Sequence, residues 1–193
     1  MSQGVSLKPN AFYHIYLSGE YPHTLFSSGD DYQQFLHLYA THMTHVVETY
    51  AYCLLPNHFH FFVRVRTLRE QVRGWLTAKQ AAADFQPAYP QDEFARLLTE
   101  FTALHLPLTI TRLLHRQQFA YLIRYIHQNP TLHGNCDNFR EWRWSSYKAL
   151  LTDQPTRIPV HIVMRWFYSV EWFEELHWET QDMTQLGYLI VED

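Results

Sequence analysis

The sequence is poor in cysteine and glycine, and it has no long apolar run. Its two cysteines, Cys53 and Cys136, are too few for a disulfide framework and suit a reducing compartment. No stretch is apolar over the ~20 residues that a helix needs to cross a bilayer. Residues 1–9 lack the basic and apolar regions of a signal peptide. We therefore expect a cytoplasmic protein without a membrane partner.

Positive charge is also scarce, because 15 Lys and Arg residues face 19 acidic residues and the net charge is −4. The charges are unevenly distributed along the chain. Residues 64–150 carry twelve Lys and Arg against seven acids, whereas residues 151–193 carry two against eight. A local basic segment is what binding to a polyanion requires. The alternative is a basic face that is merely solvated.

Apolar residues are abundant: they make up 47% of the chain, and aromatic residues 17%, so we expect a packed core and not a disordered chain. The length of 193 residues fits one domain with an elaboration. We expect that domain over residues 1–150, with a helical C-terminal extension over residues 151–193 packed on it.

The stretch Leu-Pro-Asn-His-Phe-His-Phe-Phe-Val-Arg-Val-Arg, residues 55–66, alternates strictly from His58 onward. Because side chains of a strand point alternately to its two faces, this pattern predicts a strand. One face carries Phe59, Phe61, Val63 and Val65, and the other carries His58, His60, Phe62, Arg64 and Arg66. His58 and His60 therefore project the same way and are able to hold one ion. The alternative is a pair of hydrogen-bonded histidines with a structural role.

The remaining elements follow from apolar periodicity and turn residues. Strands are expected over residues 11–17, 48–55 and 108–114, and Pro56-Asn57 forms the hairpin turn before the histidine strand. Helices are expected over residues 32–47, 67–83, 94–104 and 116–130. A short helix capped by a serine is expected to open within residues 142–148, and further short helices begin at Pro159 and Ser169.

Several residues have expected roles within these elements. Ser28 with Asp31, and Thr67 with Glu70, have the spacing of capping boxes. In the helix that follows Thr67, the residues expected to face inward are Leu68, Val72, Trp75, Leu76 and Ala83. We assign His14, on the first strand, a structural role.

The helix expected over residues 116–130 presents polar side chains beside a buried stripe. The stripe consists of Phe119, Leu122, Ile123 and Ile126. Tyr121, Tyr125 and Asn129 are spaced by four residues and so lie along one neighbouring face. Pro130 is expected to end the helix. Tyr125 is then expected at the edge of the stripe, with a simple packing role as the alternative.

Four motifs together resemble those of the HUH-type tyrosine transposases of the REP-associated branch, a family with a single catalytic tyrosine. They are Tyr13-His14-Ile15-Tyr16, Leu55-Pro56-Asn57-His58-Phe59-His60, Arg124-Tyr125-Ile126-His127-Gln128-Asn129-Pro130 and Trp144-Ser145-Ser146-Tyr147. The similarity covers most of the chain. It implies an α+β fold with a ferredoxin-like antiparallel sheet and packed helices, and an HUH endonuclease domain over residues 1–150. It also implies a bacterial-type cytosol and an association with the nucleoid.

The resemblance assigns roles residue by residue. His58 and His60 match the family's metal-binding pair, Asn129 its third ligand, and Tyr125 its nucleophile. The implied activity is the cleavage and rejoining of DNA strands through a 5′-phosphotyrosine intermediate. A tyrosine hydroxyl has a pKa of ~10, so its attack near neutral pH needs help, which a cation on the phosphodiester supplies. Nitrogen and oxygen ligands together suit Mn²⁺ at least as well as Mg²⁺, and we expect one of these ions.

Single-stranded or hairpin DNA is the expected partner. Candidate phosphate contacts, each with a solvated-face alternative, are Arg64, Arg66, Arg112 and Arg124. The chain departs from the family before the catalytic helix, where a basic hairpin with an Arg-x-Gly-Ser-Leu-Phe core is usual. Residues 106–112, Leu-Pro-Leu-Thr-Ile-Thr-Arg, stand there without the glycine and with few basic residues. A monomer and a homodimer both stay open.

Two other functions stay open as well. A catalytically idle, domesticated DNA- or RNA-binding protein would keep the fold and the basic middle segment without cleaving. A small metal hydrolase that uses His58, His60 and a water nucleophile would not need Tyr125. A covalent protein–DNA adduct is expected of the transposase alone.

Overall fold

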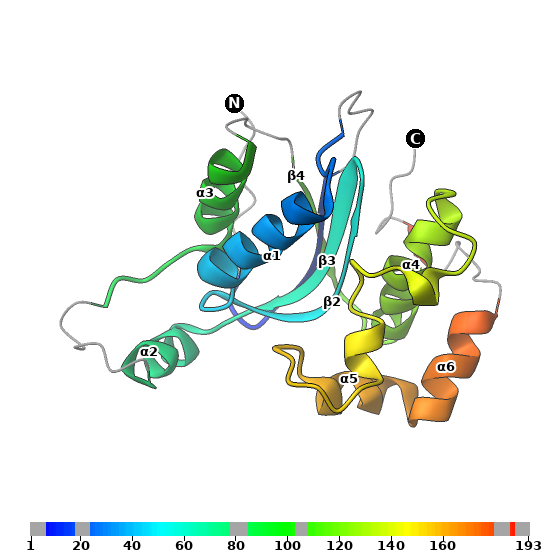
Figure 1. Cartoon of the computed structure of the whole chain (residues 1–193). Coiled ribbons are helices and arrows are strands. Elements are labelled where there is room, and N and C mark those ends of the chain that lie inside the picture. The colour runs from blue at the N-terminus through cyan, green and yellow to red at the C-terminus, as the bar shows by residue number, and fades with distance from the viewer. Residues whose placement is uncertain (1–6, 18–23, 78–84, 103–107, 180–185, 188–193) are drawn as a thin grey trace.

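The computed structural model describes residues 7–17, 24–77, 85–102, 108–179 and 186–187. Its centre is an antiparallel sheet with the strand order β2-β3-β1-β4 (Figure 1). The strands are β1 (Phe12–Leu17), β2 (Val47–Leu55), β3 (His58–Val65) and β4 (Leu108–Leu113). The four expected strands are therefore present within a residue or two, and the Pro56-Asn57 turn joins β2 to β3.

Helices cover both faces of the sheet, so the fold is α+β as expected (Figure 1). One face is covered by α1 (Gly29–Met43) and α3 (Pro90–Thr102), and the other by α4 (Gln118–Leu132). The order β1-α1-β2-β3-α3-β4, with α2 inserted before α3, is the ferredoxin-like arrangement that the motifs implied. Phe59 and Phe61 pack in the core under α1 and α3, whereas Phe62 packs in the core under α4. The alternation in β3 therefore assigned its two faces correctly.

The starts of two helices are fixed by the expected side-chain caps. The hydroxyl of Ser28 accepts a hydrogen bond from the Asp31 amide, and the Asp31 carboxylate accepts one from the Ser28 amide. Thr67 and Glu70 exchange the same pair of bonds before α2 (Leu68–Thr77). Such reciprocal bonds satisfy amide groups that the first helical turn leaves without partners.

The expectation that the apolar side of α2 faces inward is wrong. Leu68 is 54% exposed and Leu76 49% exposed, and Gln71 is the buried residue of this helix. Figure 1 shows α2 projecting away from the sheet at the lower left. The 3.6-residue period predicts which side of a helix is apolar, but it does not say what covers that side. Ala83, also expected to face inward, lies outside the described residues.

Three smaller expectations about helix boundaries were also wrong. The first helix ends at Met43, and Val47 already belongs to β2. Pro130 lies inside α4, which continues to Leu132, because the fixed φ of proline is itself helical and only one donor is lost. The helix expected to open within residues 142–148 under a serine cap is a 3₁₀ helix, Lys148–Leu150, and it has no side-chain cap.

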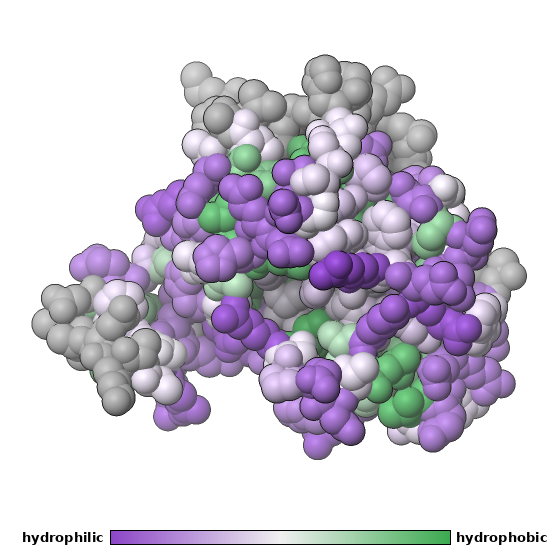
Figure 2. Space-filling model, in the orientation of Figure 1, coloured by the Kyte–Doolittle hydropathy of each residue, from purple (hydrophilic) through white to green (hydrophobic). Residues whose placement is uncertain are grey.

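The C-terminal part of the chain shares a core with α4. It contains α5 (Val160–Phe167), and α6 (Val170–Trp178) begins with the expected Ser169 cap. Phe167 and Phe173 lie in the same buried cluster as Leu122 of α4. Figure 2 shows a mainly polar surface on this side, with apolar side chains gathered at the lower right, where α5 and α6 lie. The boundary expected at residues 150 and 151 stays a prediction.

Among the described residues, no helix combines the length and the apolar character that crossing a membrane requires.

Candidate active site

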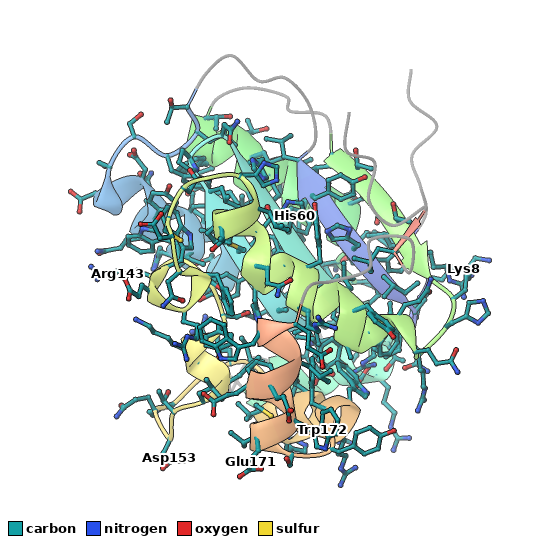
Figure 3. All side chains as sticks on the ribbon, turned by 90° about the vertical axis from the view of Figure 1, so that its right-hand side faces the viewer. Lys8, His60, Arg143, Asp153, Glu171 and Trp172 are labelled. Atoms are coloured by element: carbon teal, nitrogen blue, oxygen red, sulfur yellow. The ribbon has the colours of Figure 1, made fainter. Side chains whose placement is uncertain are left out.

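The two predicted histidines lie at the start of β3 and point to the side of the sheet that α4 covers. His60 is opposite Tyr16 on β1 and Cys53 on β2, so it lies in the middle of the sheet. Figure 3, which looks onto this side, shows His60 at the strands beside α4. His60 is only 4% exposed, whereas His58, nearer the turn, is half-buried.

His58 connects the hairpin turn to α4. Its Nδ1 lies 2.8 Å from Oδ1 of Asn57, and its Nε2 lies 3.1 Å from Oδ1 of Asn129. A neutral imidazole carries one N–H. If Nδ1 donates to Asn57, the lone pair of Nε2 faces the carbonyl oxygen of Asn129. Two facing lone pairs form a ligand pair for a cation.

His60 is held in its neutral form by its surroundings. Burial lowers the pKa of His60 well below its ordinary value, and the neighbouring His14, His58 and His133 lower it further. Its Nδ1 lies 3.0 Å from Nε2 of His14. Its buried Nε2 has no hydrogen-bond partner among the described residues. A neutral ring with a nitrogen that no protein group satisfies is suited to ligate a metal.

His14 belongs to this cluster, although the sequence indicated only a structural role for it. Its ring stacks on Tyr16, with ring centroids 4.5 Å apart, and on His60, with centroids 5.2 Å apart. His133, which follows α4, was also missed and lies edge-on to His58 at 4.7 Å. The signal for His14 was its place in the Tyr-His-Ile-Tyr motif. What the sequence did not reveal was the pairing of β1 with β3, which brings the two histidines together.

Tyr125 lies beside the histidines, and it is buried more deeply than a place at the edge of the apolar stripe indicates. Its ring is edge-on to His60 at 5.4 Å and to His14 at 6.3 Å between ring centroids. The side chain is 1% exposed. Tyr121, one turn earlier, is half-buried and shows that burial increases along this side of α4. The sequence predicted on which face of the helix Tyr125 lies, but it did not predict how deeply Tyr125 is buried.

Asn129 completes the group from one turn further along α4. It is fully buried, and its Nδ2 has no hydrogen-bond partner among the described residues, while its Oδ1 faces His58. No group of three His, Cys, Asp or Glu residues within the described parts of the chain is arranged to hold a metal. The donor set that does converge is two imidazoles and one amide oxygen. These residues fit a divalent cation that accepts both nitrogen and oxygen ligands, such as Mn²⁺.

The four candidate arginines differ sharply in their surroundings. Arg64 makes ion pairs with Glu48 at 3.2 Å and Glu70 at 2.7 Å. Arg66 donates from Nε to the backbone oxygens of Thr44 and Val47.

The other two arginines lie nearer the catalytic helix. Arg124 is 4% exposed and donates to the backbone oxygen of Glu179, and burial lowers its pKa. Arg112, on β4, is exposed. Of the four, Arg112 is therefore the one whose surroundings best suit a phosphate contact, and all four assignments stay predictions.

Comparison with known proteins gives one informative match. Neither a protein-family model nor a curated protein matches this sequence. The solved structure of a REP-associated tyrosine transposase bound to a REP hairpin matches with a TM-score of 0.56, over 77% of this chain and 85% of that one. The chain has the fold of a REP-associated tyrosine transposase. The identity is 15%, so the likeness concerns the fold, and it confirms at that level the resemblance that the motifs indicated.

Proposed function

We propose that this chain is a transposase-like endonuclease that cleaves and rejoins single-stranded DNA through a phosphotyrosine ester on Tyr125. The observation that carries the proposal is the convergence of β3 with α4. Tyr125 and Asn129 come from a helix about seventy residues after His58 and His60, yet all four side chains meet in one place. The transposase fold supports the same reading.

The proposed reaction is a reversible exchange of phosphate esters. The phenol oxygen of Tyr125 attacks the phosphorus of a phosphodiester and loses its proton. The bond from phosphorus to the 3′ oxygen breaks, and the leaving strand takes up a proton as a free 3′-hydroxyl. Attack of a 3′-hydroxyl on the phosphotyrosine reverses these changes and restores the strand. The bond energy is retained in the ester, so joining needs no further energy source.

The polar side chains around the phenol have separate tasks in this proposal. His58, His60 and Asn129 would hold a Mn²⁺ or Mg²⁺ ion. A bound ion would stabilise the negative charge that develops on the phosphate oxygens. His14 holds His60 through the contact between their ring nitrogens and so limits the orientations that the buried ring can adopt.

The DNA partner is proposed to be single-stranded or a hairpin. The solved structure that this fold matches is that of a transposase bound to a REP hairpin. Unpaired strand offers a phosphodiester that can enter a recessed site, whereas a stiff duplex does not. Because Tyr125 is 1% exposed, the site must open before a phosphodiester reaches the phenol.

The burial of Tyr125 also favours a second candidate, a nucleic-acid-binding protein that no longer cleaves. A phenol that never becomes accessible would serve only to pack against His60 and His14. Binding without an adduct, under conditions in which the metal is bound, would be the result expected of this candidate.

The experiment that tests the proposal is adduct formation on a labelled hairpin oligonucleotide with a single-stranded flank. The wild-type protein with Mn²⁺ is expected to give a labelled protein band on a denaturing gel. Tyr125→Phe removes one oxygen and keeps the ring, so its band should vanish while hairpin binding survives. Tyr121→Phe is the matched control, one helical turn away, and should retain the band. A band that persists in Tyr125→Phe would overturn the assignment.

A further inference from the structure

A buried hydrogen-bond chain lies on the side of α4 opposite the candidate site. We propose that His127 is a positioning residue, which fixes the rotation of α4 through its hydrogen bond to Ser146 and thereby orients Tyr125 and Asn129. This inference rests on the proposed function and deepens it. His127 is fully buried, and its Nε2 lies 2.8 Å from Oγ of Ser146.

The direction of each bond in the chain follows from its far end. The backbone oxygen of Phe173 can only accept, so Nδ1 of His177, 2.6 Å away, carries the proton. The Nε2 of His177 then accepts from Nδ1 of His127, at 2.9 Å. Burial favours the neutral ring, so Nε2 of His127 keeps its lone pair and accepts from the Ser146 hydroxyl. Each partner of His127 therefore uses a different ring nitrogen.

Ser146 is itself fixed to the sheet. Its amide donates to the backbone oxygen of Tyr52 at 3.0 Å, and its hydroxyl oxygen accepts from the Tyr52 amide at 2.9 Å. The hydroxyl also lies 3.2 Å from the Tyr52 backbone oxygen, but Nε2 of His127 is the nearer acceptor at 2.8 Å. The neighbouring Ser145 bridges to Cys53, and Cys53 is paired with His60 across β2 and β3. The bond from His127 thus reaches the same level of the sheet at which His60 lies.

The position of His127 on the helix explains how this bond orients the site. An α-helix turns by about 100° per residue, so His127 lies about 200° around α4 from both Tyr125 and Asn129. The buried stripe, which includes Ile126, lies between the two flanks and rests on the sheet. The apolar stripe alone permits small rotations. The short hydrogen bond from His127 to Ser146 on one flank prevents these rotations. It therefore determines how close Tyr125 and Asn129, on the other flank, lie to His60.

The competing explanation is that His127 only fastens the C-terminal helix, because His177 lies on α6. Gln128 makes further bonds between these helices: its side chain donates to the backbone oxygens of His177 and Glu179. The two explanations depend on different ring nitrogens of His127, because Nε2 contacts Ser146 and Nδ1 contacts His177. Gln in its place keeps an acceptor near the position of Nε2, toward Ser146. Asn keeps a donor near the position of Nδ1, toward His177.

The test compares His127→Asn with His127→Gln in three measurements on the full chain: single-turnover cleavage, hairpin affinity and Mn²⁺ affinity. We expect His127→Asn to lose about 10²-fold in cleavage rate, the loss that a misplacement of about 1 Å causes, and to bind Mn²⁺ more weakly. Its hairpin affinity should be unchanged. His127→Gln should retain most of the cleavage rate and of the Mn²⁺ affinity.

Further variants link the effect to Ser146. Ser146→Ala should reproduce the loss seen in His127→Asn, and the double variant should lose little more, because the two residues form one bond. Ser145→Ala is the neighbouring control: its hydroxyl accepts from the Tyr147 amide, and its removal should leave cleavage unchanged. Additive losses in the double variant would contradict the proposal.

The outcomes separate this inference from the proposed function. A wild-type protein that binds Mn²⁺ but forms no adduct would refute the proposed function, and Mn²⁺ affinity would then decide the positioning role alone. Weaker Mn²⁺ binding in His127→Asn than in His127→Gln supports that role. A larger loss in His127→Gln than in His127→Asn would assign His127 to fastening α6 through His177. Equal losses in the two variants, or wild-type behaviour of His127→Asn, would refute the inference.

Discussion

The two faces of the sheet are both buried, but they differ in the side chains that they bury. Under α1 and α3, strand β3 contributes Phe59 and Phe61 to a core of apolar side chains. Under α4, the same strand contributes Phe62 together with His58 and His60. Both faces bury apolar side chains and so stabilise the sheet, and the face under α4 also holds polar atoms that protein partners leave unsatisfied.

The difference is clearest at two atoms. Nε2 of His60 and Nδ2 of Asn129 are buried without hydrogen-bond partners among the described residues. An unsatisfied buried polar group costs about 1–3 kcal/mol, so it is a feature that folding alone disfavours. Single atoms of Gln91, Arg124, Arg140 and Tyr147 are likewise unsatisfied among the described residues, but His60 and Asn129 are the two that lie beside His58. The comparison therefore predicts that substitutions of polar residues under α4 mainly reduce activity. Substitutions of apolar residues under α1 and α3 should mainly reduce stability.

The largest effect is expected from removing a metal ligand. His58→Ala should abolish adduct formation, because it takes away the side chain that faces Asn129, while the half-buried position of His58 limits the cost to folding. Excess chelator should abolish the reaction of the wild-type protein in the same way, and added Mn²⁺ or Mg²⁺ should restore it. Full activity in chelator would show that the face under α4 has no metal role.

The next effect is on stability and falls on the other face. Phe61→Ala should lower the free energy of unfolding by about 3–5 kcal/mol, because it opens a cavity in the core under α1 and α3. His60→Leu is the comparison on the face under α4. It removes a bond to His14 and also an unsatisfied nitrogen, so the free energy should change by only about 1 kcal/mol while Mn²⁺ binding is lost. Denaturant unfolding measures the free energy of unfolding of both variants. Equal losses in Phe61→Ala and His60→Leu would contradict the predicted difference between the faces.

A smaller effect concerns DNA binding. Hairpin affinity should fall shallowly with salt, with a slope worth about three to five phosphates, since the chain has few basic residues and a net charge of −4. Arg112→Ala should reduce that slope by about 1 and leave unfolding unchanged. Arg64→Ala is the contrasting variant, because its side chain is tied to Glu48 and Glu70: it should lower stability and keep the slope. An unchanged slope in Arg112→Ala would remove this arginine from the interface.

The smallest effect is a pH dependence of the ion pair at the far end of β3. The hydrogen bond from Arg64 lowers the pKa of Glu70 from 4.5 to about 2. A lowered pKa means stability that is present above pH 4.5 and is lost as the pH falls toward 2. Because the pair is partly exposed, we expect less than about 1 kcal/mol. The free energy of unfolding in urea should differ less between pH 5 and pH 3 in Glu70→Gln than in the wild type. An equal difference in the two proteins would show that the ion pair of Glu70 with Arg64 does not contribute to the pH dependence.

Local sequence patterns predicted what depends on neighbours along the chain. The alternation in β3 assigned Phe61 and His60 to opposite faces, and the capping residues Ser28 and Thr67 marked two helix starts. Each of these features is set by contacts within a few residues. The resemblance of the motifs then supplied the fold class, which the match to a solved structure confirms.

What the sequence missed depends on contacts between distant segments. The pairing of β1 with β3 brings His14 to His60, and no local pattern encodes that register. Arg64 looked available for DNA because its partners Glu48 and Glu70 lie on other elements. Tyr125 was placed on the correct side of its helix, but its burial depends on how the helix packs against the rest of the molecule.

The most direct test of the central claim is to identify the residue that carries the DNA. The wild-type protein is allowed to react with the hairpin oligonucleotide, the DNA is digested to a short remnant, and the linked peptide is sequenced by tandem mass spectrometry. Our account predicts a 5′-phosphotyrosine on Tyr125. A remnant on Tyr121, or binding of hairpin and Mn²⁺ without any linked peptide, would contradict it.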